Sequence, residues 1–294
     1  MQVVKFKKIL AAILMMLVFS RCTEKKVAEQ NKNLCGRIAS TAPSITETFV
    51  RLGMSDNIAG VTENCVVPES SKVPLKIGKL LDINIEAIAG MNPDTVFVLS
   101  ANEPLAKKVN GMKIRTVVID QSTIEGFLFS LDIIGEVCSI SEKASTLKEE
   151  LLEKIEKIKQ SRPVADAVPR VMIVTGRDYA SDTIKDVYIA GHDGFYDELI
   201  RIAGGENVYS GNMNYPKISV EGIISLNPDI IIDTVTLPEI SDTELEKFRD
   251  NWLGLKDVNA VKNGRIYTIG KYYWSIPGPR FVDIAQDIQN MVHK

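Results

Sequence analysis

The chain has 294 residues, enough for two domains of ordinary size, and its composition is that of a folded protein. It carries 35 basic and 38 acidic residues, a formal net charge of −3 at pH 7. This acidic balance argues against a general nucleic-acid binder, which is normally basic.

The first 21 residues have the features of an export signal. Lys5, Lys7 and Lys8 precede an apolar run, residues 9–19, that is too short to span a bilayer. We therefore expect residues 1–21 to be a signal peptide and the protein to act in the periplasm or at the cell surface. Removal of this segment leaves 31 basic and 38 acidic residues, a net charge of −7.

Cys22 closes the apolar run, and this arrangement resembles the lipobox of bacterial lipoproteins, in which that cysteine carries the lipid. We predict a lipid on Cys22 that anchors the protein to the membrane, and a polar tether over residues 22–35. Arg21 stands where the lipobox has a small residue, so a cleaved signal without lipid is the alternative.

The other cysteines are Cys35, Cys65 and Cys138. Cys35 precedes one short apolar run and Cys65 follows the next; if these runs are adjacent parallel strands, the two sulfurs lie roughly 17 Å apart. A disulfide between them is therefore doubtful, and Cys138, in an apolar helical stretch, is predicted to be a small core residue. With only His192 and His293 and no C-x-x-C pair, a zinc or manganese site built on imidazoles is not expected.

Seven short apolar runs alternate with helical stretches along the chain. They cover residues 37–41, 57–61, 95–100, 115–120, 170–176, 229–235 and 265–270. The alternation predicts an α/β fold with mainly parallel sheets and helices on both faces. Several runs end in polar residues, as expected where strand ends open onto a crevice: Ser40, Ser100, Asp120, Thr175 and Asp233.

A long amphipathic helix is predicted between the fourth and fifth runs, over residues 143–163. It has about 18 helical residues, a length of roughly 27 Å, and ends at Pro163. We expect it to join an N-terminal lobe, residues 36–142, to a C-terminal lobe, residues 164–294. Its apolar stripe consists of Leu147, Leu151, Ile155 and Ile158, with exposed i, i+4 ion pairs Glu150–Lys154 and Glu153–Lys157.

One short pattern occurs twice, as INIEAIAGMNPDTVF at residues 83–97 and ISVEGIISLNPDIII at residues 218–232. In each copy a capping Asn or Ser precedes a helix, a glutamate falls in its first turn, and Asn-Pro-Asp turns the chain into a buried strand. The repeat predicts two similarly built lobes. A carboxylate in a first turn also complements the helix dipole, so a purely capping role for Glu86 and Glu221 is the alternative to a functional one.

Five stretches in order resemble the substrate-binding proteins of ABC importers for ferric siderophores, haem and cobalamin, and the match runs from about residue 36 to the end. They cover residues 37–62, 73–98, 198–209, 218–233 and 260–280. The resemblance implies two Rossmann-like lobes joined by one long rigid helix, with a ligand cleft between them and a small hinge motion. It also implies a monomeric binding protein, not an enzyme, without an intrinsic cofactor and with a ligand that contains iron or cobalt.

The resemblance also assigns a role to the repeated glutamates. In the family, one surface glutamate on each lobe pairs with arginines of the membrane permease, and these positions match Glu86 and Glu221. Charges at the rim of a protein–protein interface affect the rate of encounter and the orientation of the partners more than their affinity.

The same family places the ligand between loops at the strand ends. From the N-terminal lobe we expect Thr41, Ala42, Pro43, Ser44, Asn64, Cys65 and Lys79. From the C-terminal lobe we expect Arg177, Tyr179, His192, Tyr272, Tyr273 and Trp274. Backbone N–H groups at the helix start would bind an anionic ligand edge, the aromatic triplet would stack on a flat ligand, and Lys79 and Arg177 would neutralise its charge.

Each of these residues has an alternative role without a ligand. The segment from Thr41 is equally suited to a plain N-cap, and clustered aromatic residues also pack loops. His192 is a candidate axial ligand to haem iron or cobalt, but a lone histidine is more often a helix cap or a surface group.

Two other functions stay open. One is a secreted α/β enzyme, such as a hydrolase that uses Asp120 or Asp233, although the chain has no G-x-S-x-G, Walker A, G-x-G-x-x-G or H-E-x-x-H motif. The other is a receptor of the same fold that senses a ligand without transport, which fold alone does not exclude.

Overall fold

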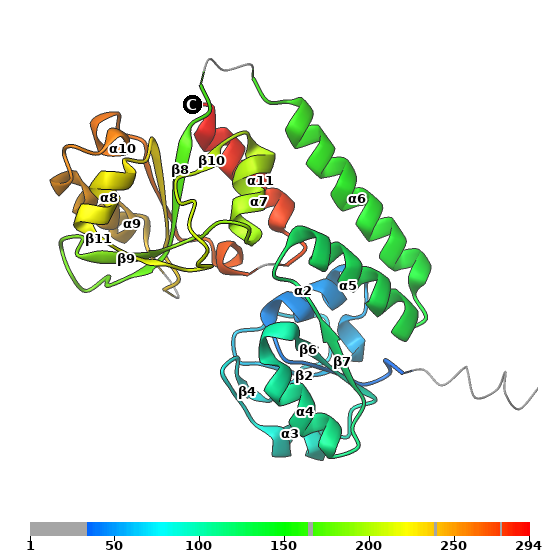
Figure 1. Ribbon diagram of the computed structural model, residues 1–294. Coiled ribbons are helices and arrows are strands. Elements are labelled where there is room, and N and C mark those ends of the chain that lie inside the picture. Colours follow the sequence, from blue (N-terminus) through cyan, green and yellow to red (C-terminus); the bar gives the residue numbers. More distant parts are fainter. Residues whose placement is uncertain (1–33, 164–166, 238–239, 277) are drawn as a thin grey trace, which may run out of the picture.

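Two sheets, one in each half of the chain, organise the protein into two α/β lobes (Figure 1). The structure is a computed structural model and describes residues 34–163, 167–237, 240–276 and 278–294. The predicted fold class, two Rossmann-like lobes joined by a long helix, is confirmed. The predicted signal peptide, the lipid site at Cys22 and all but the last two residues of the tether lie outside the described residues.

The N-terminal lobe is built on a five-stranded sheet in which every neighbouring pair is parallel. Its central strands are buried on both faces: Phe97 packs on Phe49 on one side, while Val96 and Val98 face the other. In spatial order the strands are β3 (Leu75–Lys76), β2 (Ile58–Val61), β1 (Ile38–Ser40), β6 (Thr95–Leu99) and β7 (Thr116–Ile119).

Helices cover both faces of this sheet (Figure 1). On the face toward the other lobe lie α2 (Pro43–Arg51) and α5 (Ile124–Val137); the opposite face carries α3 (Ile85–Met91) and α4 (Glu103–Gly111). The remaining short elements are the hairpin of β4 (Gly78–Lys79) and β5 (Asp82–Ile83), and the 3-10 turns η1 (Ser55–Asn57) and η2 (Ser100–Asn102).

The C-terminal lobe has a mixed sheet. Its strands run in the order β11 (Lys217–Ser219), β9 (Asp186–Ile189), β8 (Arg170–Arg177), β12 (Ile230–Thr234) and β13 (Ile266–Ile269), and β10 (Glu206–Asn207) pairs with the start of β8. β12 is parallel to β8 and β13, whereas β9 is antiparallel to β8 and β11. All seven predicted strands are present, whereas β9, β10 and β11 of this lobe, like β3, β4 and β5 of the other, were not predicted.

Helices again cover both faces of the second sheet. The face toward the linking helix carries α7 (Phe195–Ala203) and α11 (Phe281–Val292). The other face carries α8 (Val220–Leu226), α9 (Asp242–Asp250), α10 (Asn259–Lys262) and the 3-10 turn η3 (Asn251–Gly254). A last 3-10 turn, η4 (Tyr272–Ser275), precedes α11.

The linking helix α6 runs from Ser141 to Gln160, two residues earlier at its start and three at its end than predicted. All four residues of its apolar stripe are buried, and both i, i+4 ion pairs form, with N–O distances of 3.0 Å for Glu150–Lys154 and 2.6 Å for Glu153–Lys157. Figure 1 shows α6 extending from the N-terminal lobe along the other lobe before the chain enters β8.

The two lobes share one apolar core instead of meeting only at α6. The ring of Phe281 in α11 lies 5.6 Å from that of Phe127 in α5 and 6.3 Å from that of Phe195 in α7. All three rings belong to one buried cluster that includes the stripe of α6. A large opening of the lobes would expose these rings to water, so the packing favours a small hinge motion.

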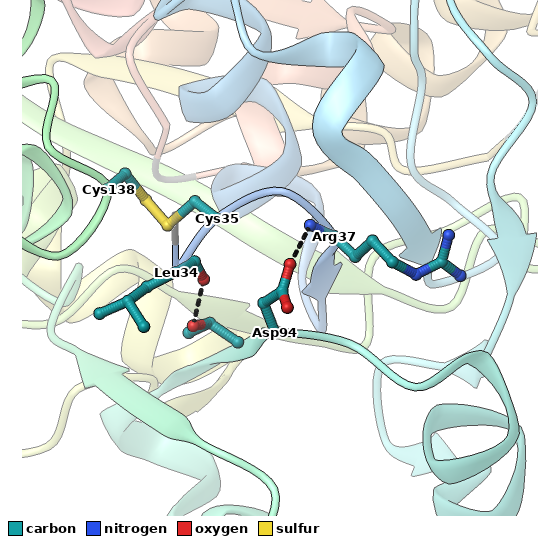
Figure 2. The surroundings of a disulfide bond; sticks show 6 residues. Leu34, Cys35, Arg37, Asp94 and Cys138 are labelled. Carbon is teal, nitrogen blue, oxygen red and sulfur yellow. Dashed lines mark hydrogen bonds between the residues drawn. A yellow bond between two sulfur atoms is a disulfide. The ribbon is translucent and has the colours of Figure 1, made fainter. Parts of the chain in front are cut away.

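Cys138 was predicted to be a small core residue; it is buried in the core, but its disulfide was not predicted. It forms a disulfide with Cys35, with Cα atoms 5.1 Å apart, and ties the start of the N-terminal lobe to the end of α5 (Figure 2). Cys65 is a free, buried thiol. The doubt about a Cys35–Cys65 bond was justified, since β1 and β2 are adjacent parallel strands as assumed.

The repeated pattern folds in the same way in both lobes. The predicted caps form: Asn84 accepts a hydrogen bond from the Ala87 N–H, and Ser219 accepts one from the Gly222 N–H. Both helices end at a left-handed asparagine: Asn92 at φ 48° and Asn227 at φ 43°. The proline turn thus follows a helix cap that needs a positive φ, which asparagine tolerates.

An arginine completes each copy of the repeat. The backbone N–H of Arg37 donates to Asp94 and its guanidinium donates to the Met91 carbonyl, at 2.8 and 2.7 Å (Figure 2 shows the Asp94 bond). In the other lobe Arg170 donates in the same way to the carboxylate of Asp229 and the carbonyl of Leu226, at 2.9 and 2.8 Å. The similarity of the two lobes therefore includes an arginine at the start of a neighbouring strand, β1 or β8, that binds the end of the repeated helix.

Among the described residues, no helix combines the length and the apolar character that crossing a bilayer requires.

Candidate functional site

A cavity of about 290 Å³ lies between the lobes. One wall comes from the ends of β6 and β7 in the N-terminal lobe, and the other from the start of α7 and the loop before β11. The first wall consists of Leu99, Ser100, Ala101, Asp120, Gln121 and Ser122, and the second of Ala190, Gly191, Gly194, Phe195, Tyr196, Asn214, Tyr215 and Ser275.

Asp120 is held in place by its neighbours in the first wall. Its Oδ1 accepts hydrogen bonds from the Ser100 hydroxyl at 3.1 Å and from the Ser122 N–H at 3.0 Å. Burial alone raises the pKa of Asp120, but these hydrogen bonds outweigh it and hold the pKa below its usual value. Asp120 therefore presents an anion to the cavity at neutral pH.

Gln121 borders the same cavity and has no hydrogen-bond partner for its side chain. The residue is 3% exposed, and neither its Oε1 nor its Nε2 has a partner within the described structure. An unpaired buried polar group costs about 1–3 kcal/mol, and such groups are rare in native proteins. This amide is the most unusual polar group in the cavity wall.

The second wall is fixed by backbone contacts. The Gly191 N–H donates to the Asn214 carbonyl at 2.8 Å, and a Cβ on Gly191 would fall 1.7 Å from the Met213 carbonyl oxygen, so only glycine fits there. Tyr196 donates its hydroxyl to the Trp274 carbonyl, and burial raises the pKa of Tyr196, which stays neutral. These bonds give the cavity a rigid, uncharged side.

The charge of the cavity is negative. Asp120 is the one charged residue among those that line it, and no Lys, Arg or His of the described chain is among them. An anionic ligand in this cavity would therefore have no cation to pair with.

The predicted residues Thr41, Ala42 and Ser44 are buried beneath the start of α2, and Pro43 occupies its first turn. The hydroxyl of Thr41 donates to the Phe97 carbonyl at 2.9 Å. These four residues do not line the cavity. They form the start of α2, whose N-cap is Ala42 and receives no hydrogen bond from a capping side chain, so their contact with a ligand stays a prediction.

Two other predicted residues meet across the lobes. The hydroxyl of Tyr272, in η4, donates to the carbonyl of Asn64, which follows β2. Cys65 is buried next to Thr62, with 3.1 Å between its sulfur and the Thr62 hydroxyl, and Lys79 is exposed in β4. None of these four predicted residues lines the cavity, and their contact with a ligand stays a prediction.

The side chains of Arg177 and Tyr179 both bind Asp233, a buried residue of the C-terminal lobe. The side chains of Arg177 and Asp233 are 1% and 0% exposed and form an ion pair at 2.8 Å. Tyr179 donates to Asp233 at 3.1 Å and Trp252 donates to it at 3.0 Å. The guanidinium also lies 4.5 Å from the centre of the Tyr179 ring. The side chain of Arg177 is therefore buried in this network, and Arg177 does not line the cavity between the lobes.

Tyr273 and Trp274 bind the same carboxylate. Tyr273 donates to Asp287 at 2.8 Å and the indole of Trp274 donates to it at 3.1 Å; Trp274 is 1% exposed. Arg280 covers the Tyr273 ring and pairs with Glu47 of α2 in the other lobe. The aromatic triplet therefore lies where the two lobes meet. The backbone carbonyl of Trp274 accepts the hydrogen bond from Tyr196, a residue of the cavity wall.

His192 is not among the residues that line the cavity, although Gly191 and Gly194, which flank it in the sequence, are. Its Nδ1 is 3.0 Å from Asp193, and ligand atoms of His192, Asp193 and Asp197 lie within 4.8 Å of one another. Asp197 already accepts hydrogen bonds from the Asp193 N–H and from Arg201. The axial-ligand role of His192 stays a prediction.

A family model described as "Periplasmic binding protein" matches residues 38–273. The chain belongs to this family.

Individual members of the family are similar over most of their length. An uncharacterised ABC transporter substrate-binding lipoprotein of Bacillus subtilis, YvrC, is 28% identical over 265 residues, 87% of this chain and 80% of that protein. A cobalamin-binding protein of Halobacterium salinarum is 24% identical over 266 residues, 87% of this chain and 69% of that protein. The crystal structure of a possible iron-binding, periplasmic solute-binding protein of Staphylococcus epidermidis superposes with a TM-score of 0.73 at 26% identity, covering 88% of this chain and 99% of that one.

Glu86 and Glu221 occupy equivalent positions in the two lobes of this periplasmic binding protein. Both are exposed and both lie in the first turn of a capped helix, α3 or α8. Hydrogen bonds from its own backbone N–H and the Ser219 hydroxyl lower the pKa of Glu221, so it is anionic at neutral pH. Their contact with a permease stays a prediction.

None of the residues that line the cavity was among the predicted ligand residues. Ser100 and Asp120 had been noted as polar residues at strand ends, and both line the cavity. Gln121, Tyr196 and Tyr215 were missed. A systematic count of residues directly after each predicted strand would have found Gln121, whereas no local pattern marks Tyr196 or Tyr215.

Proposed function

We propose that this chain is the extracytoplasmic substrate-binding protein of an ABC importer, which holds an iron chelate or a corrinoid in the cavity between its lobes. The observation that carries the proposal is a cavity between the two lobes of a periplasmic binding protein, with walls from both sheets. Two relatives of the chain support the proposal: one is named a substrate-binding lipoprotein and the other a cobalamin-binding protein.

The size of the cavity bears on how such a ligand would fit. A volume of about 290 Å³ is at the lower end of small-molecule sites. A macrocycle would therefore enter the cavity by one edge, and the rest of the ligand would lie between the outer parts of the lobes.

Ligand binding is tested by thermal melting and tryptophan fluorescence with haemin, cyanocobalamin and a ferric tris-catecholate. Trp274 contacts a residue of the cavity wall through its carbonyl and serves as a reporter. A ligand at a hundred times its dissociation constant stabilises the protein by about 2.7 kcal/mol. If none of these compounds raises the melting temperature, the proposed class of ligand is wrong.

Delivery to the permease is the second part of the proposal. Glu86 and Glu221 place an exposed carboxylate at the equivalent position of each lobe. A permease with two equivalent halves would therefore contact both lobes at once. Glu86→Lys and Glu221→Lys should weaken binding to the permease without changing ligand affinity. Glu103→Lys is a matched control, because Glu103 is an exposed first-turn glutamate of α4 outside the repeat.

Transport also distinguishes this function from the alternatives. A ligand-sensing receptor would bind the same ligand without stimulating ATP hydrolysis by a permease. For a hydrolase, Asp233 is unsuited because its carboxylate already binds Arg177, Tyr179 and Trp252. The family description and the relative named as an ABC transporter substrate-binding lipoprotein support a role without catalysis.

We expect the protein to be exported and anchored to the membrane by a lipid. The disulfide between Cys35 and Cys138 supports export, since structural disulfides persist mainly in oxidising compartments. Replacement of Cys22 by alanine should release the protein from the membrane fraction if that residue carries the lipid. Retention of the variant in membranes would mean that another segment anchors it.

A further inference from the structure

Asp120 presents an unpaired carboxylate oxygen at the cavity between the lobes. The residue is exposed and lines the cavity, and both hydrogen bonds that it accepts, from the Ser100 hydroxyl and the Ser122 N–H, end at Oδ1. In the described part of the chain, Oδ2 has neither a hydrogen-bond donor nor a cation beside it. The carboxylate is thus anchored through one oxygen, while the other oxygen can accept a donor from a ligand.

Aromatic rings contribute to the opposite wall. Phe195, Tyr196 and Tyr215 line it, and Tyr215 is 55% exposed, so a ligand can reach its ring. Burial raises the pKa of both tyrosines, which stay neutral and add no charge. The faces of aromatic rings are partly negative and attract cations, most of all quaternary and protonated amines.

A carboxylate and aromatic rings in one cavity favour a positive group. An anionic edge of a ligand would bring a like charge to Asp120, and a neutral edge would remove water from Asp120 without replacing it by a counter-charge. A protonated amine supplies three N–H donors and a positive charge, which suit both Oδ2 and a ring face. The volume of about 290 Å³ suits an arm of a ligand better than a whole macrocycle.

We propose that Asp120 is a specificity-determining residue that pairs with a protonated amine on the part of the ligand that enters the cavity, and that the ring of Tyr215 contacts the same amine. This inference rests on the proposed function, because it assigns the charge of the ligand group held in the same cavity. It concerns that arm of the ligand and not the part that holds the metal.

The test uses two ferric chelates that differ only at one amine. Ferrioxamine B has an arm that ends in a protonated amine, and in N-acetylferrioxamine B this amine is neutral. In calorimetric titrations the wild type should bind the ammonium form about tenfold more tightly, as expected for one charge-assisted hydrogen bond. High salt should reduce this difference, because Asp120 is exposed.

Asp120→Asn removes the charge but keeps an oxygen that can accept the bonds from Ser100 and Ser122. It should bind the ammonium form only as well as the acetylated form, and its affinity for the acetylated form should be unchanged. Tyr215→Leu should lower the preference by a smaller factor, about threefold.

Asp178→Asn is the matched control. Asp178 is exposed, and its Oδ1 accepts the Ala180 N–H at 3.0 Å, in the same two-residue turn that Asp120 makes with Ser122. It does not line the cavity between the lobes. This variant should bind both chelates as the wild type does.

Equal affinity of the wild type for the two chelates would overturn the inference, as would an Asp120→Asn variant that keeps the preference. Binding of haemin, cyanocobalamin or the ferric tris-catecholate alone would also overturn it, because none of them carries an ammonium group; the proposed function would then stand. Absence of binding by every compound would overturn the proposed function itself, and the inference with it.

Discussion

Replacing Cys35 and Cys138 together with serine removes a cross-link between residues 103 positions apart. For a closed loop of about 100 residues, the restriction of the unfolded chain corresponds to about 4.7 kcal/mol at 25 °C, and measured losses for native disulfides are about 2–5 kcal/mol. We expect the double variant to unfold with a free energy lower by about 3–5 kcal/mol. At roughly 2–4 °C per kcal/mol for a protein of this size, the melting temperature falls by roughly 10 °C.

The assay is denaturant unfolding of a chain that begins at residue 34, with and without reductant. Reductant should shift the wild type to the midpoint of the double variant and leave the double variant unchanged. Cys65→Ser is the control, since Cys65 is a free thiol and this change should not alter the effect of reductant. Equal midpoints for the oxidised wild type and the double variant, or three reactive thiols in the unfolded, unreduced wild type, would refute the reasoning.

Three further changes test the interior and the turns. Asp233→Asn leaves the guanidinium of Arg177 buried without a counter-charge and should cost about 3–5 kcal/mol in unfolding experiments, whereas Glu153→Gln, which breaks an exposed pair on α6, should cost less than about 0.5 kcal/mol. Asn92→Val places a β-branched residue at φ 48° and should cost about 1–2 kcal/mol; Asn92→Gly should be nearly neutral, and equal losses for both would show that φ is not the cause. Burial raises the pKa of Glu198, so its contribution to stability is fully present below about pH 4.3 and is lost as the pH rises through the folded-state pKa; Glu198→Gln should flatten that loss in midpoints measured from pH 4 to 7, and an unchanged slope would rule Glu198 out as its source.

The elements of the fold were predictable because they depend on neighbours in sequence. Short apolar runs predicted the seven main strands, and the apolar stripe with its i, i+4 pairs predicted α6 to within three residues at each end. The N-caps at Asn84 and Ser219 were predictable for the same reason, since each side chain binds a backbone N–H three residues ahead. A recurring sequence pattern therefore sufficed to predict two similar lobes.

The residues of the site were harder to predict than the elements of the fold, because only some of the strand ends lie at the cavity. Ser100 and Asp120 end adjacent strands, β6 and β7, and both reach the cavity. Thr41 directly follows the central strand β1 and Asp233 lies near the end of β12, yet both are buried, and Asp233 accepts a hydrogen bond from the indole of Trp252. Which strand ends face a ligand depends on the helices packed over them, and this packing has no local pattern.

The sequence alone determined the α/β class, the two lobes, the linking helix and the family resemblance, because periodicity, capping residues and proline turns act over a few residues. Tertiary structure alone decided that Cys35 pairs with Cys138, that Arg177 meets Asp233 56 residues away, and that Gln121 has no partner beside the cavity. Each of these depends on which distant elements come together. Such contacts arise only when the faces of both sheets have been covered and the lobes have packed against each other.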